Sequence, residues 1–288
     1  MTQFQIALIL IMVISTSFKT GKPAWMLYSK DGKPIKYEKM VRKIQDADII
    51  LFGELHNNPI SHWLQLELSL ELLRARGSDL IMGAEMFESD NQVILDEYLQ
   101  GLISQSRFEN EARLWPNYKT DYKPLVKLAY DNQLRFIATN IPRRYASIVS
   151  TKGFEGLNEL SEQAKAFLPP LPIEYDPDLK AYSSMLEMEG MGNHSNANFP
   201  KAQAIKDATM AYHILENWSQ EKLFLHFNGA YHSDNYESIY WYLKQQNQEL
   251  KIVTLTTVSQ RNISNLQEEN KGKADYIICV DENLTPTH

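Results

Sequence analysis

Short apolar runs alternate with amphipathic segments along most of this chain. Ile49–Phe52 is the clearest run, too short for anything but a buried strand, and Pro59–Arg74 follows it at helical spacing. The predicted strands are Trp25–Tyr28, Ile49–Phe52, Leu80–Ala84, Leu134–Thr139, Leu223–Phe227, Lys251–Thr256 and Tyr276–Val280. The predicted helices are Tyr37–Gln45, Pro59–Arg74, Asn91–Ser104, Pro124–Asn132, Lys201–Trp218 and Asn235–Gln246. This alternation predicts a single α/β domain over residues 24–280, with a mainly parallel central sheet flanked by helices.

The regular pattern breaks between about residues 150 and 200. A segment this long without a clear period is typical of a functional lid, and we expect a helical and loop cap over the strand ends. Met185, Met188, Met191 and His194 repeat every third residue within it, but the glutamates between them favour a solvated lid over a soft-metal site.

The N-terminus predicts export. Ile6–Ile14 is too short to span a bilayer but has the length of a secretory signal core, and Ser15 and Ser17 suit a cleavage site. We therefore expect a signal peptide at residues 1–17, a periplasmic or cell-envelope location and no integral membrane span in the mature chain. A buried N-terminal helix or a misplaced start codon is the alternative, because no Lys or Arg precedes the apolar run. The single Cys279 leaves no cysteine for a lipid anchor.

The composition and net charge of the chain indicate which classes of binding partner to expect. The chain has 288 residues, of which 43% are hydrophobic and 23% charged, as in a soluble protein with a sizeable core. The net charge is −7 and no run of Lys or Arg stands out. Nucleic acid is therefore not an expected partner, since phosphate neutralisation needs a basic face.

Polar residues follow four of the predicted strands. They are Glu54 and His56, Glu85 and Glu88, Asn140 and Arg143, and Asn228 and His232. Each alone is explained by a helix cap or a turn. Because the carboxyl ends of parallel strands meet at one edge of a sheet, we expect these side chains to converge in a cleft. Carboxylate and imidazole groups in a cleft are typical of a ligand-binding or acid–base site.

The same residues carry a resemblance to a known family. The segment Phe52–Pro59, with sequence FGELHNNP, and His62 after it resemble the opening motif of the ChaN-like haem-binding proteins, which are grouped with erythromycin esterases and Tiki/TraB proteins. Further matching segments follow in the family's order: Glu85–Glu88, Asn140–Arg143, Lys206–Ala211 and Phe227–His232. The likeness covers roughly residues 46–246.

The resemblance implies an exported haem-binding protein of iron or haem acquisition or handling, forming a homodimer that encloses paired haems. A tyrosine is expected to ligate ferric iron, which takes a phenolate well. The residues that we expect to bind the cofactor are His56, His62, Tyr118, Tyr122, Arg143 and Tyr145. Lys206 stands where the family more often has Arg, so a bidentate contact is lost there.

Two other functions remain open. Glu54, His56, Glu85 and His232 could act as the catalytic groups of an esterase-like or peptidase-like hydrolase. In its metal-dependent form, His56 and His232 would ligate a divalent metal ion and a glutamate would be the base. The third hypothesis is an envelope interaction module whose polar cluster only stabilises the strand ends.

Overall fold

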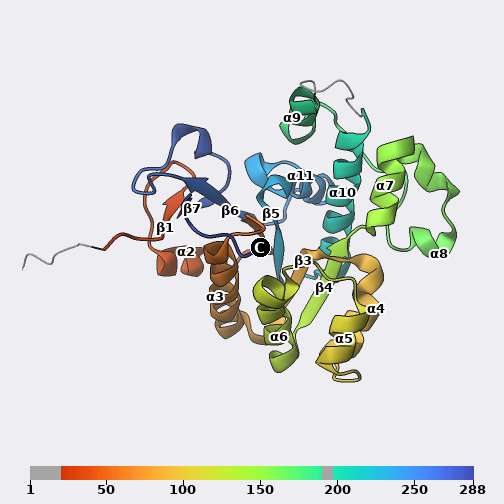
Figure 1. The fold of residues 1–288 in the computed structure, drawn as a ribbon, viewed down its shortest axis with the longest axis horizontal. Helices are drawn as coiled ribbons and strands as arrows, with labels where there is room; N and C mark the ends of the chain where they lie inside the picture. The colour runs from red at the N-terminus through yellow and green to blue at the C-terminus, as the bar shows by residue number, and fades with distance from the viewer. Residues whose placement is uncertain (1–20, 190–196) are drawn as a thin grey trace, which may run out of the picture.

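The computed structural model describes residues 21–189 and 197–288, without the side chains of residues 187–189. The predicted signal peptide lies outside the described residues, and so do Met191 and His194. Within the described part, one sheet has the strand order β1-β7-β6-β2-β5-β3-β4 (Figure 1). The strands are β1 (Trp25–Ser29), β2 (Ile49–Glu54), β3 (Leu80–Glu88), β4 (Arg135–Asn140), β5 (Leu223–Gly229), β6 (Ile252–Gln260) and β7 (Tyr276–Asp281).

Every neighbouring pair of strands is parallel except the edge pair β1–β7, which is antiparallel. The helices are α2 (Tyr37–Ile44), α3 (Pro59–Arg76), α4 (Gln92–Leu99), α5 (Gln105–Glu111), α6 (Lys123–Asn132), α7 (Arg143–Lys152), α8 (Glu162–Lys165), α9 (Lys180–Glu189), α10 (Phe199–Asn217) and α11 (Ile239–Gln246). The predicted α/β fold is confirmed. None of the helices in the described residues is long and apolar enough to cross a bilayer.

Two apolar layers cover the sheet. Ile50 and Phe52 of β2 join the core that packs beneath α2, α3 and α6, whereas Ile49 and Leu51 join the core beneath α10 and α11. Successive strand side chains point to opposite faces, so a strand covered on both faces reads as an unbroken apolar run. This burial explains why β2 is the clearest run in the sequence.

Some boundaries differ from the predicted ones. The predicted helix Asn91–Ser104 is interrupted, because α4 ends at Leu99 and the chain turns at Gly101 with φ of +74° before α5 begins. The last predicted helix begins at Ile239 and not at Asn235, because Asn235, Tyr236 and Ser238 have positive φ.

The described residues between 150 and 189 form a separate layer next to α10. Leu157 and Leu168 pack with Ile205 of α10, and Tyr182 of α9 packs with Ala204. Figure 1 shows α9 beside the first turns of α10, away from α3 and α6. The described part of the predicted cap is therefore tied to the helix that carries Lys206 and Asp207.

Candidate functional site

The carboxyl ends of β2, β5 and β3 meet in one cavity. Glu54 is level with Gly229 in the parallel pairing of β2 and β5, and Glu85 follows Ala84, which is level with Phe227. This edge opens into a cavity of about 570 Å³. Its lining residues are Glu54, Leu55, His56, Asn57, Glu85, Gln203, Lys206, Gly229, Ala230, Tyr231, His232 and His288. The four predicted acid and imidazole residues therefore converge.

Glu54 and His56 form the first acid–imidazole pair. Glu54 is 1% exposed, and its Oε1 accepts hydrogen bonds from the Tyr122 hydroxyl at 2.7 Å and from His56 Nδ1 at 2.8 Å. Its Oε2 accepts from the Gln65 amide. A carboxylate only accepts, so the proton between the pair is on Nδ1 of His56. The imidazole is thereby fixed with Nε2 toward Gly229.

Gly229 lets the His56 ring approach the strand end. A Cβ at this position would lie 2.7 Å from His56 Nε2 and 3.5 Å from Glu85 Oε2. A side chain at this position would displace the ring. The glycine therefore leaves a small space between His56 Nε2 and the Glu85 carboxylate. Burial lowers the pKa of His56, but the hydrogen bond to Glu54 and the charge of Glu85 outweigh burial and raise it.

His232 forms a second and more buried arrangement. Its Nε2 is 3.3 Å from Glu85 Oε1, and its Nδ1 is 2.5 Å from Asp207 Oδ1. Burial acts to lower the pKa of His232, but Glu85 and Asp207 outweigh it and raise the pKa to about 10. Burial also opposes ionisation of Glu85, yet His232, His56 and the Gly229 N–H together lower the pKa of Glu85. His232 is therefore held as an imidazolium at neutral pH.

Sequence reasoning missed the role of Asp207. It appeared only inside the Lys206–Ala211 segment, although its side chain is fully buried and also accepts a hydrogen bond of 2.9 Å from the Tyr182 hydroxyl of α9. Burial raises the pKa of Asp207. The available signal was an acid in a helix with Ala204, Ala208 and Ala211 on the neighbouring turns, since a buried acid needs partners.

Several predicted cofactor-binding residues lie away from the cavity lining. Tyr122 is in the core with its hydroxyl on Glu54, and Tyr118 packs edge-on against Phe87. His62 is 6% exposed on α3, with Nε2 3.4 Å from Asp121 Oδ2.

The third predicted set is also separate from the cavity. Arg143 is exposed at the start of α7, and Tyr145 is buried among the residues of the cap layer. Glu88 forms an ion pair of 3.1 Å with Arg113, outside the cavity lining. Of the predicted cofactor-binding residues, only His56 lines the cavity.

A tyrosine that was not among the predicted ligands does line the cavity. Tyr231 follows β5, is 36% exposed, and donates a hydrogen bond to the Ala181 carbonyl oxygen of α9. It lies within the Phe227–His232 segment, so the family motif contained the signal. Within residues 21–189 and 197–288, no group of three or more His, Cys, Asp or Glu side chains is arranged to hold a metal ion. Metal ligation by His56 and His232 stays a prediction.

These features define an α/β protein with acid–imidazole pairs at the carboxyl edge of its sheet. Residues 40–243 match the family described as haem-binding uptake, Tiki superfamily, ChaN. Since this match spans more than half of the chain, the protein belongs to that family. A curated relative, Protein RETICULATA-RELATED 5, chloroplastic, of Arabidopsis thaliana, is 26% identical over 209 residues. The match covers 68% of this chain but only 27% of that relative's length.

Solved structures share the fold. ChaN of Campylobacter jejuni, described with cofacial haem binding, superposes with a TM-score of 0.67 at 18% identity, over 88% of this chain and 96% of that one. A succinoglycan biosynthesis protein gives a TM-score of 0.53 at 12% identity, over 89% and 93% of the two chains. An erythromycin esterase mutant in its open conformation gives 0.50 at 10% identity, over 91% and 100%. At these identities the likeness shows the fold alone.

Proposed function

We propose that this protein binds haem in the strand-end cavity and serves in iron or haem acquisition or handling as an exported protein. The observation that carries the proposal is the cavity of about 570 Å³ at the ends of β2, β5 and β3, in which one imidazole is fixed by a buried carboxylate. Membership of the haem-binding family and the fold shared with ChaN support it.

The residues of the cavity fit a haem group. Haem, when bound, supplies a ferric iron that takes a phenolate or imidazole ligand, together with two anionic propionates. Tyr231 is the tyrosine that would ligate the iron, and His56, whose Nδ1 is held by Glu54, is the imidazole available to it. Lys206 would hold a propionate, and the charge of the buried His232 would favour an anion in the cavity.

An exposed apolar rim supports a dimer. Tyr231, Phe199 and Leu186 are 36%, 44% and 42% exposed. Phe199 is one helical turn before the cavity residue Gln203, and Leu186 is on α9, whose Ala181 carbonyl bonds Tyr231. Such a rim would leave one edge of a macrocycle uncovered, and a second copy of the chain would cover it.

A haem titration tests the binding proposal. Addition of haem to the purified protein should give a ferric spectrum of the tyrosinate type at micromolar concentration, and Tyr231→Phe should abolish that spectrum. Tyr240→Phe on α11 is the matched control and should leave it unchanged. No spectral change in the unaltered protein would overturn haem binding. Loss of the spectrum in Tyr122→Phe but not in Tyr231→Phe would overturn only the assignment of the ligand.

Two further measurements test the remaining parts. Sedimentation velocity should show a dimer in the haem-loaded protein and a monomer in Phe199→Glu; an unaltered monomer with haem bound would contradict the dimer. N-terminal sequencing of protein recovered from the producing cell's envelope should begin after residue 17. Retention of residues 1–17 in an internal fraction would contradict export.

A hydrolase is the second candidate. The specific observation is that the His56 ring is half-buried and its Nδ1 is bound to buried Glu54, as in a general base oriented by an acid. Hydrolysis of p-nitrophenyl butyrate should then be lost in His56→Ala and kept in His213→Ala. Equal rates in both variants and in the unaltered protein would remove this candidate.

A further inference from the structure

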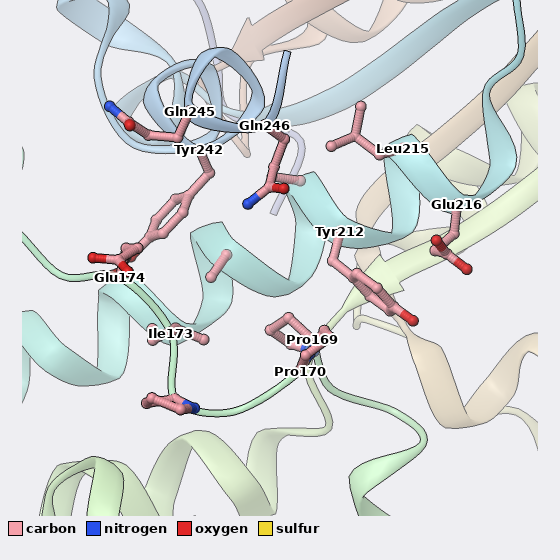
Figure 2. Close-up of a pocket in the computed structure, with 13 residues that line it drawn as sticks. Pro169, Pro170, Ile173, Glu174, Tyr212, Leu215, Glu216, Tyr242, Gln245 and Gln246 are labelled. Carbon is pink, nitrogen blue, oxygen red and sulfur yellow. The ribbon is translucent and has the colours of Figure 1, made fainter.

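A second cavity, of about 450 Å³, lies between α10, α11 and the loop at residues 169–174 (Figure 2). Its volume is within the range of roughly 300–1,000 Å³ for small-molecule sites. Its lining residues are Pro169, Pro170, Pro172, Ile173, Glu174, Ala208, Ala211, Tyr212, Leu215, Glu216, Tyr242, Gln245 and Gln246. None of them lines the strand-end cavity.

Small side chains of α10 leave the space of this cavity, and proline and tyrosine rings form its walls. Ala208 and Ala211 are one turn apart on α10 and leave room that larger residues would fill. Tyr242 of α11 is buried, and its hydroxyl donates a 2.8 Å hydrogen bond to the Glu174 carbonyl oxygen, which fixes the loop to α11. Figure 2 shows Tyr242 and Tyr212 on either side of this hollow, with Pro169 below Tyr212. The site is pre-formed, so binding orders little.

The second cavity carries negative charge, whereas a haem propionate needs a positively charged partner. Glu174 and Glu216 are exposed at its rim, and no Lys, Arg or His is among its lining residues. Lys206 and the charged His232 line the other cavity. The Gln246 amide lies between the ribbons of α10 and α11 in Figure 2 and offers both a donor and an acceptor.

We propose that this second cavity binds a small aromatic amine. The flat ring would pack among the prolines and the two tyrosine rings, which also attract a cation through their faces. The field of Glu174 and Glu216 would select the positively charged form. This site shares no lining residue with the strand-end cavity.

Two probes that share an indole ring but carry opposite charges test the proposal. Isothermal titration of the full chain with tryptamine should give saturable binding, and indole-3-acetate should bind about ten-fold more weakly or not at all. No saturable heat with tryptamine, or equal affinity for the two probes, would overturn it. Haem is not added, so failure here leaves haem binding untouched.

Variants locate the bound probe. Ala211→Leu should fill the hollow and abolish tryptamine binding. Tyr212→Ala should weaken tryptamine binding, and it replaces Ala211→Leu as the test if circular dichroism shows that Ala211→Leu is unfolded. Glu174→Gln combined with Glu216→Gln should remove the preference for the cation. Glu111→Gln combined with Glu268→Gln, at two exposed glutamates outside this cavity, is the charge-matched control and should change nothing. Unchanged binding in folded Ala211→Leu and in Tyr212→Ala would overturn the assignment to this cavity.

Discussion

His56 and His232 are both paired with a glutamate at the same sheet edge, yet they differ in burial and in the number of acids. His56 is half-buried and its ring nitrogen Nδ1 contacts one acid, Glu54. His232 is 4% exposed and lies between two buried acids, Glu85 and Asp207. The first imidazole keeps one nitrogen for a ligand, while both nitrogens of the second are used.

The neighbours of a histidine, and not the residue type, decide what its ring can do. Burial alone would make both rings neutral. Two carboxylates outweigh burial at His232 and hold it as a fixed positive charge, whereas one direct carboxylate leaves His56 able to exchange a ligand or a proton. We expect His232 to set the charge of the cavity and His56 to contact its guest.

The largest expected effect is a loss of stability when the buried pair of His232 and Asp207 is broken. Asp207→Asn should lower the free energy of unfolding by about 3–5 kcal/mol, because it removes one partner of a buried charged pair. Urea denaturation at pH 7 measures the loss. Asp131→Asn, at an exposed pair with Lys127, is the control and should cost less than about 1 kcal/mol. Equal stability of the two variants would show that Asp207 does not hold His232.

The pH dependence of stability separates the two histidines. The pKa of His232 is raised from 6.5 in the unfolded chain to about 10, so its stabilisation is fully present below pH 6.5 and is lost as the pH rises toward 10. The free energy of unfolding should fall over this window by up to about 1.4 kcal/mol per pH unit.

Urea titrations at a series of pH values measure this slope. Asp207→Asn should flatten it, whereas His56→Ala should leave most of it. A flat profile between pH 7 and pH 10 in the unaltered protein would show that His232 is not held charged in the native state.

A smaller effect is expected at the first pair. Glu54→Gln should lower the free energy of unfolding by about 2 kcal/mol, since Tyr122 and Gln65 lose a charged acceptor. It should also lower the pKa of His56, because burial is then no longer offset by the carboxylate. Nuclear magnetic resonance titration of the His56 ring measures the change. A His56 pKa that does not fall would show that Glu54 does not tune it.

The smallest effect is expected at Lys206, which is half-buried at the cavity wall. Lys206→Met should weaken haem binding by about five-fold, the contribution of one screened ion pair, and Lys206→Arg should match or exceed the unaltered protein because a guanidinium can bind a carboxylate in two places. Haem affinity and thermal stability are measured on the same samples. Tighter haem binding in Lys206→Met would contradict a role in holding propionates.

The amino-acid pattern predicted the strands and the convergence of their ends. Glu54, His56, Glu85 and His232 were all found, because each follows an apolar run whose end is marked by a local change to polar residues. The pattern did not reveal which tyrosine faces the cavity. Tyr118 and Tyr122 stand in a polar, aromatic-rich passage, yet they are buried by contacts with distant segments.

By itself, the sequence determined the α/β class, the order of the strand ends and the likeness to the haem-binding family, since periodicity, turns and motifs are local properties of a chain. Three features appear only in the folded chain: Asp207 pairs with His232, Gly229 makes room for His56, and Tyr231 lines the cavity. These depend on which residues of β2, β5 and α10 become neighbours. Burial and charge pairing are created by packing between segments far apart in the chain, so a local pattern can mark such residues but cannot assign their partners.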